Sequence, residues 1–232
     1  MHRWGTGWLA VVTSMALLLG AAGARADDAH DARQLVEKAK LTVEEFQADA
    51  NMGTLRDLAK KAKGMLILPQ MLRAAFLVGA SGGNGVLVAR DGKTGQWRGP
   101  AFYTLGGASF GFQAGADAAE VIILAMTERG VTKLLSPQVK LGADISVAAG
   151  PVGAGAAAAT AGLSADLISF SMAKGLYGGF SLDGSVAGVR TALNHAYYGK
   201  ATSPTDILVK GAVKNPEANA LIGAVAKLAG GR

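Results

Sequence analysis

The residues that could carry out covalent chemistry occur here only as fragments of known catalytic motifs. Ser171-Met-Ala-Lys174 has the Ser-x-x-Lys spacing of serine acylases, in which the lysine accepts the serine proton. Lys93-Thr-Gly95 matches the Lys-Thr-Gly element of the same enzymes, but here it precedes the serine, which reverses their order. Ser171 also lies in a pattern typical of a strand, whereas the acylase serine sits on a helix. We therefore assign no catalytic residues.

Nucleotide and metal chemistry also lack their required residues. Gly92-Lys-Thr94 resembles the end of a phosphate-binding loop, but Leu87 occupies the position of its first glycine. The chain has no cysteine, and His195 stands apart from the other two histidines and from any cluster of carboxylates. No cofactor and no metal site are therefore expected.

Basic side chains form the candidate binding surface. Arg56, Lys60 and Lys63 recur at i, i+4 and i+7, which places them on one face of a predicted helix, and Lys61 flanks them. An anionic membrane attracts each nearby basic side chain by about 1 kcal/mol. Charge alone favours the simpler interpretation of a solvated helix face. Lipid binding by this face is thus a hypothesis that needs support from the rest of the chain.

A second basic group surrounds a predicted hairpin. Asp91-Gly92 lies between runs rich in Val, Leu, Phe and Tyr, a pattern that predicts a tight turn between two strands. Arg90, Lys93 and Arg98 flank this turn, and Trp97 between them is expected to lie at the membrane interface. These four residues complete a set of candidate lipid-binding side chains.

Residues 1–26 have the pattern of a secretory leader. Arg3 supplies a positive start, Trp8–Leu19 is mostly apolar, and Ala24-Arg-Ala26 offers small residues at the cleavage site. The apolar run is shorter than the roughly 20 residues that a spanning helix needs, so a retained anchor is the weaker interpretation. We expect a periplasmic or secreted protein, cleaved after Ala26, which can associate peripherally with a membrane.

The overall charge is mildly basic. The formal net charge is +6, and loss of Arg3 and Arg25 with the leader lowers it to about +4. Such a balance suits attraction to an anionic membrane, but it is too weak and too dispersed to predict nucleic-acid binding.

The apolar pattern divides the mature chain into three zones. Residues 31–63 have helical periodicity, residues 65–190 consist of strands and tight turns, and residues 191–229 are helical again. Thirty-three glycines with 50% hydrophobic residues indicate compact strand packing rather than disorder. The expected fold is α+β, a strongly coiled, antiparallel-rich sheet with N-terminal and C-terminal helices packed around it. Residues 27–232 are expected to form a single domain.

Details of the strand zone predict tight backbone packing. Asp183-Gly184 predicts a second hairpin turn. A dense set of glycines among strand-forming residues indicates bends or close backbone approach. These glycines are Gly106, Gly107, Gly111 and Gly115.

A segment of small residues, Gly142–Thr160, carries the most specific resemblance. It first alternates its side chains and then runs into glycine and alanine, which are costly to order unless other backbone packs closely against them. This segment and several further blocks, in the same order, resemble the SYLF domain family, a lipid-binding module. The blocks are Lys63–Pro69, Gly82–Arg90, Gln96–Phe102, Gly106–Gly115, Phe170–Leu182 and Asn194–Gly199, within roughly residues 33–229.

The resemblance implies lipid binding without catalysis. In eukaryotic SYLF members lipid binding is associated with an N-terminal amphipathic helix and basic side chains. Some members also bind actin, a property that we do not transfer to an exported protein. Where the family often has a basic residue after Gly-Pro-x-Gly, this chain has Ala154, so no headgroup contact is expected there. Ile145–Leu163 is expected to form two strands and a turn.

Three function hypotheses follow. The first is a non-enzymatic envelope protein that binds anionic phospholipid headgroups through its basic side chains. The second is an envelope structural module that binds a protein partner through its Gly/Ala-rich surface. The third is an enzyme of unknown class.

Overall fold

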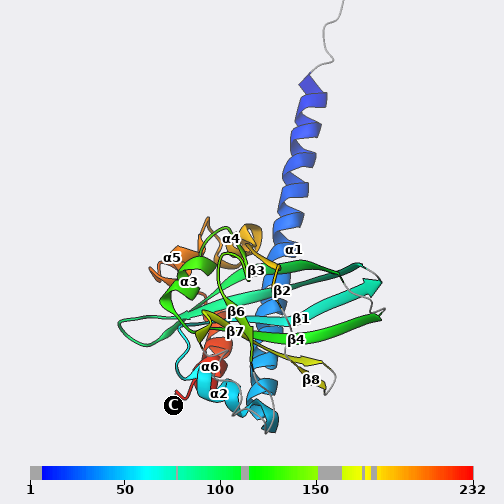
Figure 1. Ribbon diagram of the computed structural model, residues 1–232. Coiled ribbons are helices and arrows are strands. Elements are labelled where there is room, and N and C mark those ends of the chain that lie inside the picture. The colour runs from blue at the N-terminus through cyan, green and yellow to red at the C-terminus, as the bar shows by residue number, and fades with distance from the viewer. Residues whose placement is uncertain are drawn as a thin grey trace, which may run out of the picture.

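The computed structural model describes the backbone of residues 7–76, 78–110, 115–150, 164–173, 176–178 and 182–231. Within these ranges the side chains of residues 7–26, 74–76, 78, 108–110, 115–117 and 176–178 are not described. The helices are α1 (Gly7–Ala48), η1 (Ala50–Met52), α2 (Gly53–Ala59), α3 (Glu128–Leu134), α4 (Thr191–Tyr198), α5 (Pro204–Leu208), η4 (Pro216–Ala218) and α6 (Asn219–Leu228). The strands are β1 (Gly64–Phe76), β2 (Val78–Arg90), β3 (Trp97–Phe110), β4 (Gly115–Ala125), β5 (Gln138–Lys140), β6 (Val147–Ala149), β7 (Leu167–Ala173), β8 (Leu176–Gly178) and β9 (Val186–Val189) (Figure 1).

The strands form one curled sheet in the order β5-β9-β3-β2-β1-β4-β7-β6, with β8 paired to β7. All pairs between these strands are antiparallel except β6 with β7. Helices precede and follow the sheet along the chain. The expected α+β fold, with an antiparallel-rich coiled sheet between terminal helices, is confirmed.

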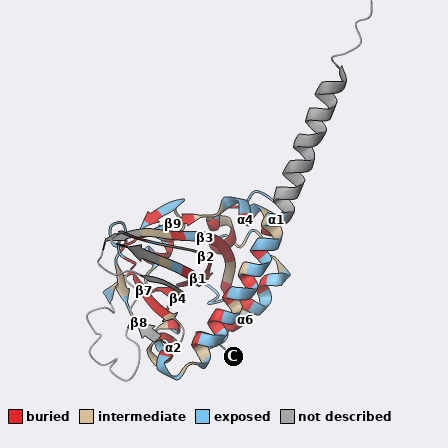
Figure 2. Ribbon diagram, turned by 90° about the vertical axis from the view of Figure 1, so that its right-hand side faces the viewer, coloured by how far each residue is buried: buried red, intermediate tan, exposed pale blue. Residues whose placement is uncertain are grey.

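Successive residues of the central strands point into two different cores. Met65 and Ile67 of β1 belong to the core that α1, α4 and α6 cover. Leu66 and Leu68 belong to the opposite core, which α3 and α5 close. Figure 2 shows buried residues along the side of α1 that faces the sheet. The period-2 alternation of the strands therefore sets which side chains meet α1.

The two predicted hairpin turns have different outcomes in the structure. Asp91 and Gly92 do connect the paired strands β2 and β3. Asp183 and Gly184 form a turn, but the strand that follows, β9, pairs with β3 and β5 rather than with β8. The second hairpin prediction was thus wrong in its pairing, because a local turn signal does not determine which distant strand accepts the hydrogen bonds.

The small-residue segment is only partly described. Its first part contains the short strand β6 beside β7, and residues 151–163, including Ala154, lie outside the described part. Among the glycines, Gly107 does meet close backbone, since a Cβ there would lie 3.2 Å from the Cα of Ser185. Gly106 has more room, since the nearest neighbour of such a Cβ would be the Ser81 carbonyl oxygen at 3.7 Å. Gly111 lies outside the described residues.

Helix α1 runs through the predicted cleavage point after Ala26. Beyond that point its buried residues are Ala32, Val36, Ala39, Thr42, Val43 and Phe46. Among the residues whose side chains the structure describes, no helix is both long enough and apolar enough to cross a bilayer.

Candidate functional site

The predicted basic stripe is not a helical face. Helix α2 ends at Ala59, Lys60 is its C-cap, and Lys63 follows the helix immediately before β1. Because the helix does not continue past Lys60, the i, i+4, i+7 spacing does not place Lys63 on the same helical face as Arg56 and Lys60. The stripe prediction was wrong because the helix is too short.

Arg56 serves an internal contact. Its Nη1 donates hydrogen bonds to the carbonyls of Gln47, at 3.2 Å, and Asp49, at 2.6 Å. Both carbonyls lie at the C-terminal end of α1, where backbone acceptors lack helical partners and attract positive charge. Arg56 therefore ties α2 to the end of α1, and it is only partly available to a membrane.

The neighbouring lysines remain at the surface. Lys60 pairs with Asp57 at 2.7 Å, and Lys63 pairs with Glu128 at 3.6 Å. Lys61 is exposed and has no acidic partner among the described residues. Exposed pairs of this kind are weak and exchange readily with other anions. These lysines are still candidate headgroup contacts.

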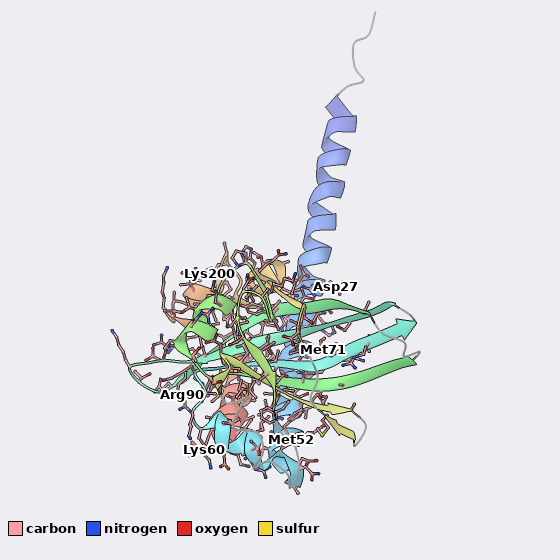
Figure 3. All side chains as sticks on the ribbon, in the orientation of Figure 1. Asp27, Met52, Lys60, Met71, Arg90 and Lys200 are labelled. Atoms are coloured by element: carbon pink, nitrogen blue, oxygen red, sulfur yellow. The ribbon has the colours of Figure 1, made fainter. Side chains whose placement is uncertain are left out.

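Arg90 links the lysine group to the β2–β3 hairpin. Its Nη1 donates to the Lys60 carbonyl at 3.1 Å, and its guanidinium carbon lies 5.0 Å from the centre of the Trp97 ring. Figure 3 shows Arg90 and Lys60 on the same side of the molecule. Trp97 itself is only 8% exposed and belongs to the core beneath α1 and α6. The expectation of an interfacial tryptophan was therefore wrong.

Arg98 also makes internal contacts. Its Nη2 lies 2.6 Å from Asp91 Oδ2, and its Nη1 donates to the Val209 carbonyl at the end of α5. Lys93, in the turn itself, stays exposed without an acidic partner among the described residues. The hairpin thus combines one free lysine with one arginine that joins it to the C-terminal region.

A pocket of about 320 Å³ lies where the hairpin meets that region; we call it the hairpin pocket. The cationic side chains Arg98, Lys210 and Lys214 line it from segments more than a hundred positions apart. Gly211, with φ at +60°, passes close to Arg98, since a Cβ there would lie 3.3 Å from the Arg98 Cζ. The remaining lining residues are Gln96, Trp97, Gly99, Ile207, Val213, Asn215, Ala218, Asn219 and Ile222.

Two carboxylates balance part of this positive charge. Asp206 accepts from Lys210 at 2.9 Å, and its pKa falls to about 2 because the Ser203 hydroxyl and then Lys210 donate to it. The pKa of Asp91 is also lowered, first by the Thr94 backbone N–H. Lys214 is exposed and has no acidic partner among the described residues. The pocket therefore has a surplus of positive charge at neutral pH and suits an anionic group.

The sequence did not identify Lys210 and Lys214. They follow α5, and only tertiary packing brings them to the hairpin. The one local signal was Lys210-Gly211, a turn that holds a charged residue at the surface between two helical patterns.

The two fragments of catalytic motifs lie on different elements, and Lys93–Gly95 belongs to the connection between β2 and β3. Ser171 is buried in β7, and Lys174 lies outside the described residues. In the described part of the chain, no three histidine, cysteine, aspartate or glutamate side chains gather as a metal site would require.

Comparisons with known proteins agree on one family. The family described as "Ysc84: Las17-binding protein actin regulator" matches residues 106–228. Protein YSC84 of Saccharomyces cerevisiae is 35% identical over 164 residues, which cover 68% of this chain and 34% of the relative. Human SH3 domain-containing YSC84-like protein 1 is 34% identical over 152 residues, 64% of this chain and 43% of the relative. The chain thus spans about a third of the yeast relative's length, and neither name describes an enzyme.

Proposed function

This chain belongs to the Ysc84 family, whose domain is the SYLF domain, and from that premise we propose that it is a non-enzymatic, phospholipid-binding protein of a bacterial envelope. The proposal concerns this domain alone, because the matched relatives are much longer than the chain. Anionic phospholipid headgroups are the proposed ligand.

The convergence of Arg98, Lys210 and Lys214 on the hairpin pocket is the observation that supports this proposal most. A phosphate accepts several charge-assisted hydrogen bonds at once, and arginine and lysine are its usual partners. Lys214 can contribute without first giving up an acidic partner among the described residues. Each basic side chain near an anionic membrane contributes about 1 kcal/mol.

The surface lysines extend the proposed membrane contact. Lys61 and Lys93 are free of acidic partners among the described residues, and Lys60 and Lys63 have only exposed ones. Arg56 and Arg90 hold the backbone on which these lysines sit. We assign the arginines a positioning role and the lysines the direct attraction.

Replacement of both pocket lysines tests the proposal. K210Q/K214Q should weaken binding to phosphatidylglycerol-containing vesicles about 10- to 30-fold at low salt, as follows from about 1 kcal/mol for each charge. The matched control K133Q/K140Q removes the same charge from exposed positions outside the pocket and should cost less than threefold. Vesicle cosedimentation measures both. Equal losses would contradict the pocket, and a wild-type protein that binds no vesicle would contradict the function.

A second candidate function is binding of a protein partner, which the relatives' names favour. The matched family is described as Las17-binding and actin-regulating. Actin is not proposed as a partner here, because we propose that this chain is exported. A protein that remains in solution with every vesicle composition, but retains its fold, would favour this second function.

We also propose that the chain is exported and matures after Ala26. The leader pattern of residues 1–26 supports this proposal. The described core contacts of α1 begin at Ala32, so the mature protein would keep the helix face that packs on the sheet. Membrane binding would then take place in the periplasm or outside the cell.

A further inference from the structure

A continuous groove lies between α1 and the outer halves of the central strands. Its two hollows measure about 470 and 380 Å³ and share Lys38, Pro69 and Gln70. Figure 1 shows these outer strand halves extending past α1. We call the two hollows together the α1 groove.

A register shift in β1 creates the floor of this groove. Pairing with β2 and with β4 is irregular between Ile67 and Met71. Beyond the shift Met71 points into the core opposite α1, so its neighbours Gln70 and Leu72 lie on the α1 side. Small residues at Gly82 and Ala118, which flank Leu72 on the adjacent strands, leave that side open.

The walls of the groove expose apolar side chains. The described part of the chain exposes four large hydrophobic residues, and Leu41 at 45% and Leu72 at 54% line the groove. They come from α1 and β1. Pro69, Ala119 and Met172 make the larger hollow mostly apolar, whereas Gln70, Asn84 and Thr104 give the smaller hollow a more polar lining. Single exposed leucines are ordinary, but apolar side chains gathered along one groove mark a site for an apolar ligand.

The strands of the floor offer no backbone edge. β1 pairs with both β2 and β4, and β4 pairs with both β1 and β7. A peptide added as an extra strand would find no free row of donors and acceptors there. A hydrocarbon chain needs none.

One charged side chain sits where the two hollows meet. Lys38 is exposed, lines both of them, and has no acidic partner among the described residues. Two carboxylates also line the larger hollow: the exposed Glu45, and the half-buried Glu120, which accepts a hydrogen bond from Thr42 Oγ1 at 2.6 Å. Lys38 thus offers a positive charge to an anionic group at the place where the two hollows meet.

We propose that the α1 groove holds one acyl chain of a membrane phospholipid, with Lys38 next to its phosphate. This inference rests on the lipid-binding function proposed above and names a site separate from the hairpin pocket. The two sites lie on different parts of the sheet: β2 runs from Asn84 at the groove to Arg90 near the hairpin, a rise of about 20 Å for six residues. Each can therefore be altered without the other.

The test uses monomeric palmitoyl-lysophosphatidylglycerol, below its micelle concentration, as a single-chain probe. Native mass spectrometry should show one bound probe, and titration calorimetry should show at least tenfold weaker binding for L41S/L72S. V186S/V209S, which alters the other two exposed hydrophobic residues of the described chain, should bind as wild type does. A118W, which fills the groove, should abolish binding, and K38Q should weaken it several-fold.

Other results separate the two proposals. Equal probe affinity in wild type and L41S/L72S, or equal binding of headgroup glycerol phosphate without a chain, would overturn the groove. If the same wild-type protein still binds anionic vesicles, the lipid-binding function stands. Probe binding that L41S/L72S abolishes, in a protein that binds no vesicle, would support the groove and overturn the membrane-binding function. L41S/L72S changes only exposed side chains, so it keeps the test decisive if A118W does not fold.

Discussion

The arginines and lysines of the basic surface differ in what their donors contact. Arg56, Arg90 and Arg98 each donate to a backbone carbonyl at the end of an element or a turn. A guanidinium presents several donors in a fixed plane, so it can join two segments of backbone, whereas an ammonium is strongly hydrated and tends to remain in water. The exposed lysines are therefore the better candidates for reversible contact with a membrane.

Arg56 gives a prediction at this scale. R56Q should lower the free energy of unfolding by about 1–2 kcal/mol, because the carbonyls of Gln47 and Asp49 lose a charged donor. K61Q, at an exposed position, should change it by less than about 0.5 kcal/mol. Urea denaturation of both variants measures the difference. Equal stability would show that Arg56 is dispensable to the fold.

Glu120 gives a second prediction, on pH. Burial, followed by Glu45 nearby, raises its pKa from 4.5 to about 7, against the opposing effect of the Thr42 hydrogen bond. Between these values the folded protein retains a proton that the unfolded chain releases, so stability falls as pH rises through this window. Below pH 4.5 Glu120 is protonated in both the folded and the unfolded state, so its titration no longer changes the stability.

E120Q removes this titration. Its melting temperature relative to wild type should therefore rise between pH 4.5 and 7 and then remain level. E37Q, at an exposed position of α1, should show no such trend. Calorimetry across the pH series measures both variants, and a constant difference for E120Q would contradict a raised pKa.

At the scale of elements, close contact between the backbones of neighbouring strands determines which positions require glycine. β1 and β2 approach closely around the register shift, where a Cβ on Gly85 would lie 2.4 Å from the Ile67 carbonyl oxygen. A carbonyl in a paired strand cannot move aside as a flexible side chain can. The glycine content of the sequence indicated such contacts and correctly included Gly107, but it also included Gly106, which has room, and it did not include Gly85. Density of glycine along a strand does not say which residue faces a neighbouring backbone.

Gly85→Ala tests the close approach. It should destabilise the fold by about 2 kcal/mol, within the usual range for overpacking. Gly106→Ala meets only an ordinary contact at 3.7 Å and should be neutral or slightly stabilising, because alanine costs less backbone entropy. Thermal melts of the two variants provide the comparison. A Gly85→Ala protein as stable as Gly106→Ala would show that β1 and β2 can separate locally.

At the scale of the whole molecule, the sequence predicts the succession of helical and strand-rich zones better than the tertiary contacts between distant residues. The helical, strand-rich and helical zones follow from periodicity, which depends on neighbouring residues. The hairpin pocket joins Arg98 to Lys214, and the α1 groove joins Leu41 to Leu72; neither pair has a local signal. Trp97 was misplaced for the same reason, because its burial comes from helices that lie far away in sequence.

The relation of α1 to the rest of the fold gives the last prediction. Its described buried side chains begin at Ala32, so residues 27–232 should retain the contacts of α1 with the sheet. A leader peptidase should cut after Ala26, and N-terminal sequencing of protein from the periplasmic fraction should begin at Asp27. Purified 27–232 should melt within a few degrees of the full chain, because no described core residue is lost. Full-length protein recovered from the inner membrane would contradict export with cleavage, and a 27–232 protein that does not fold would show that residues before Asp27 support the domain.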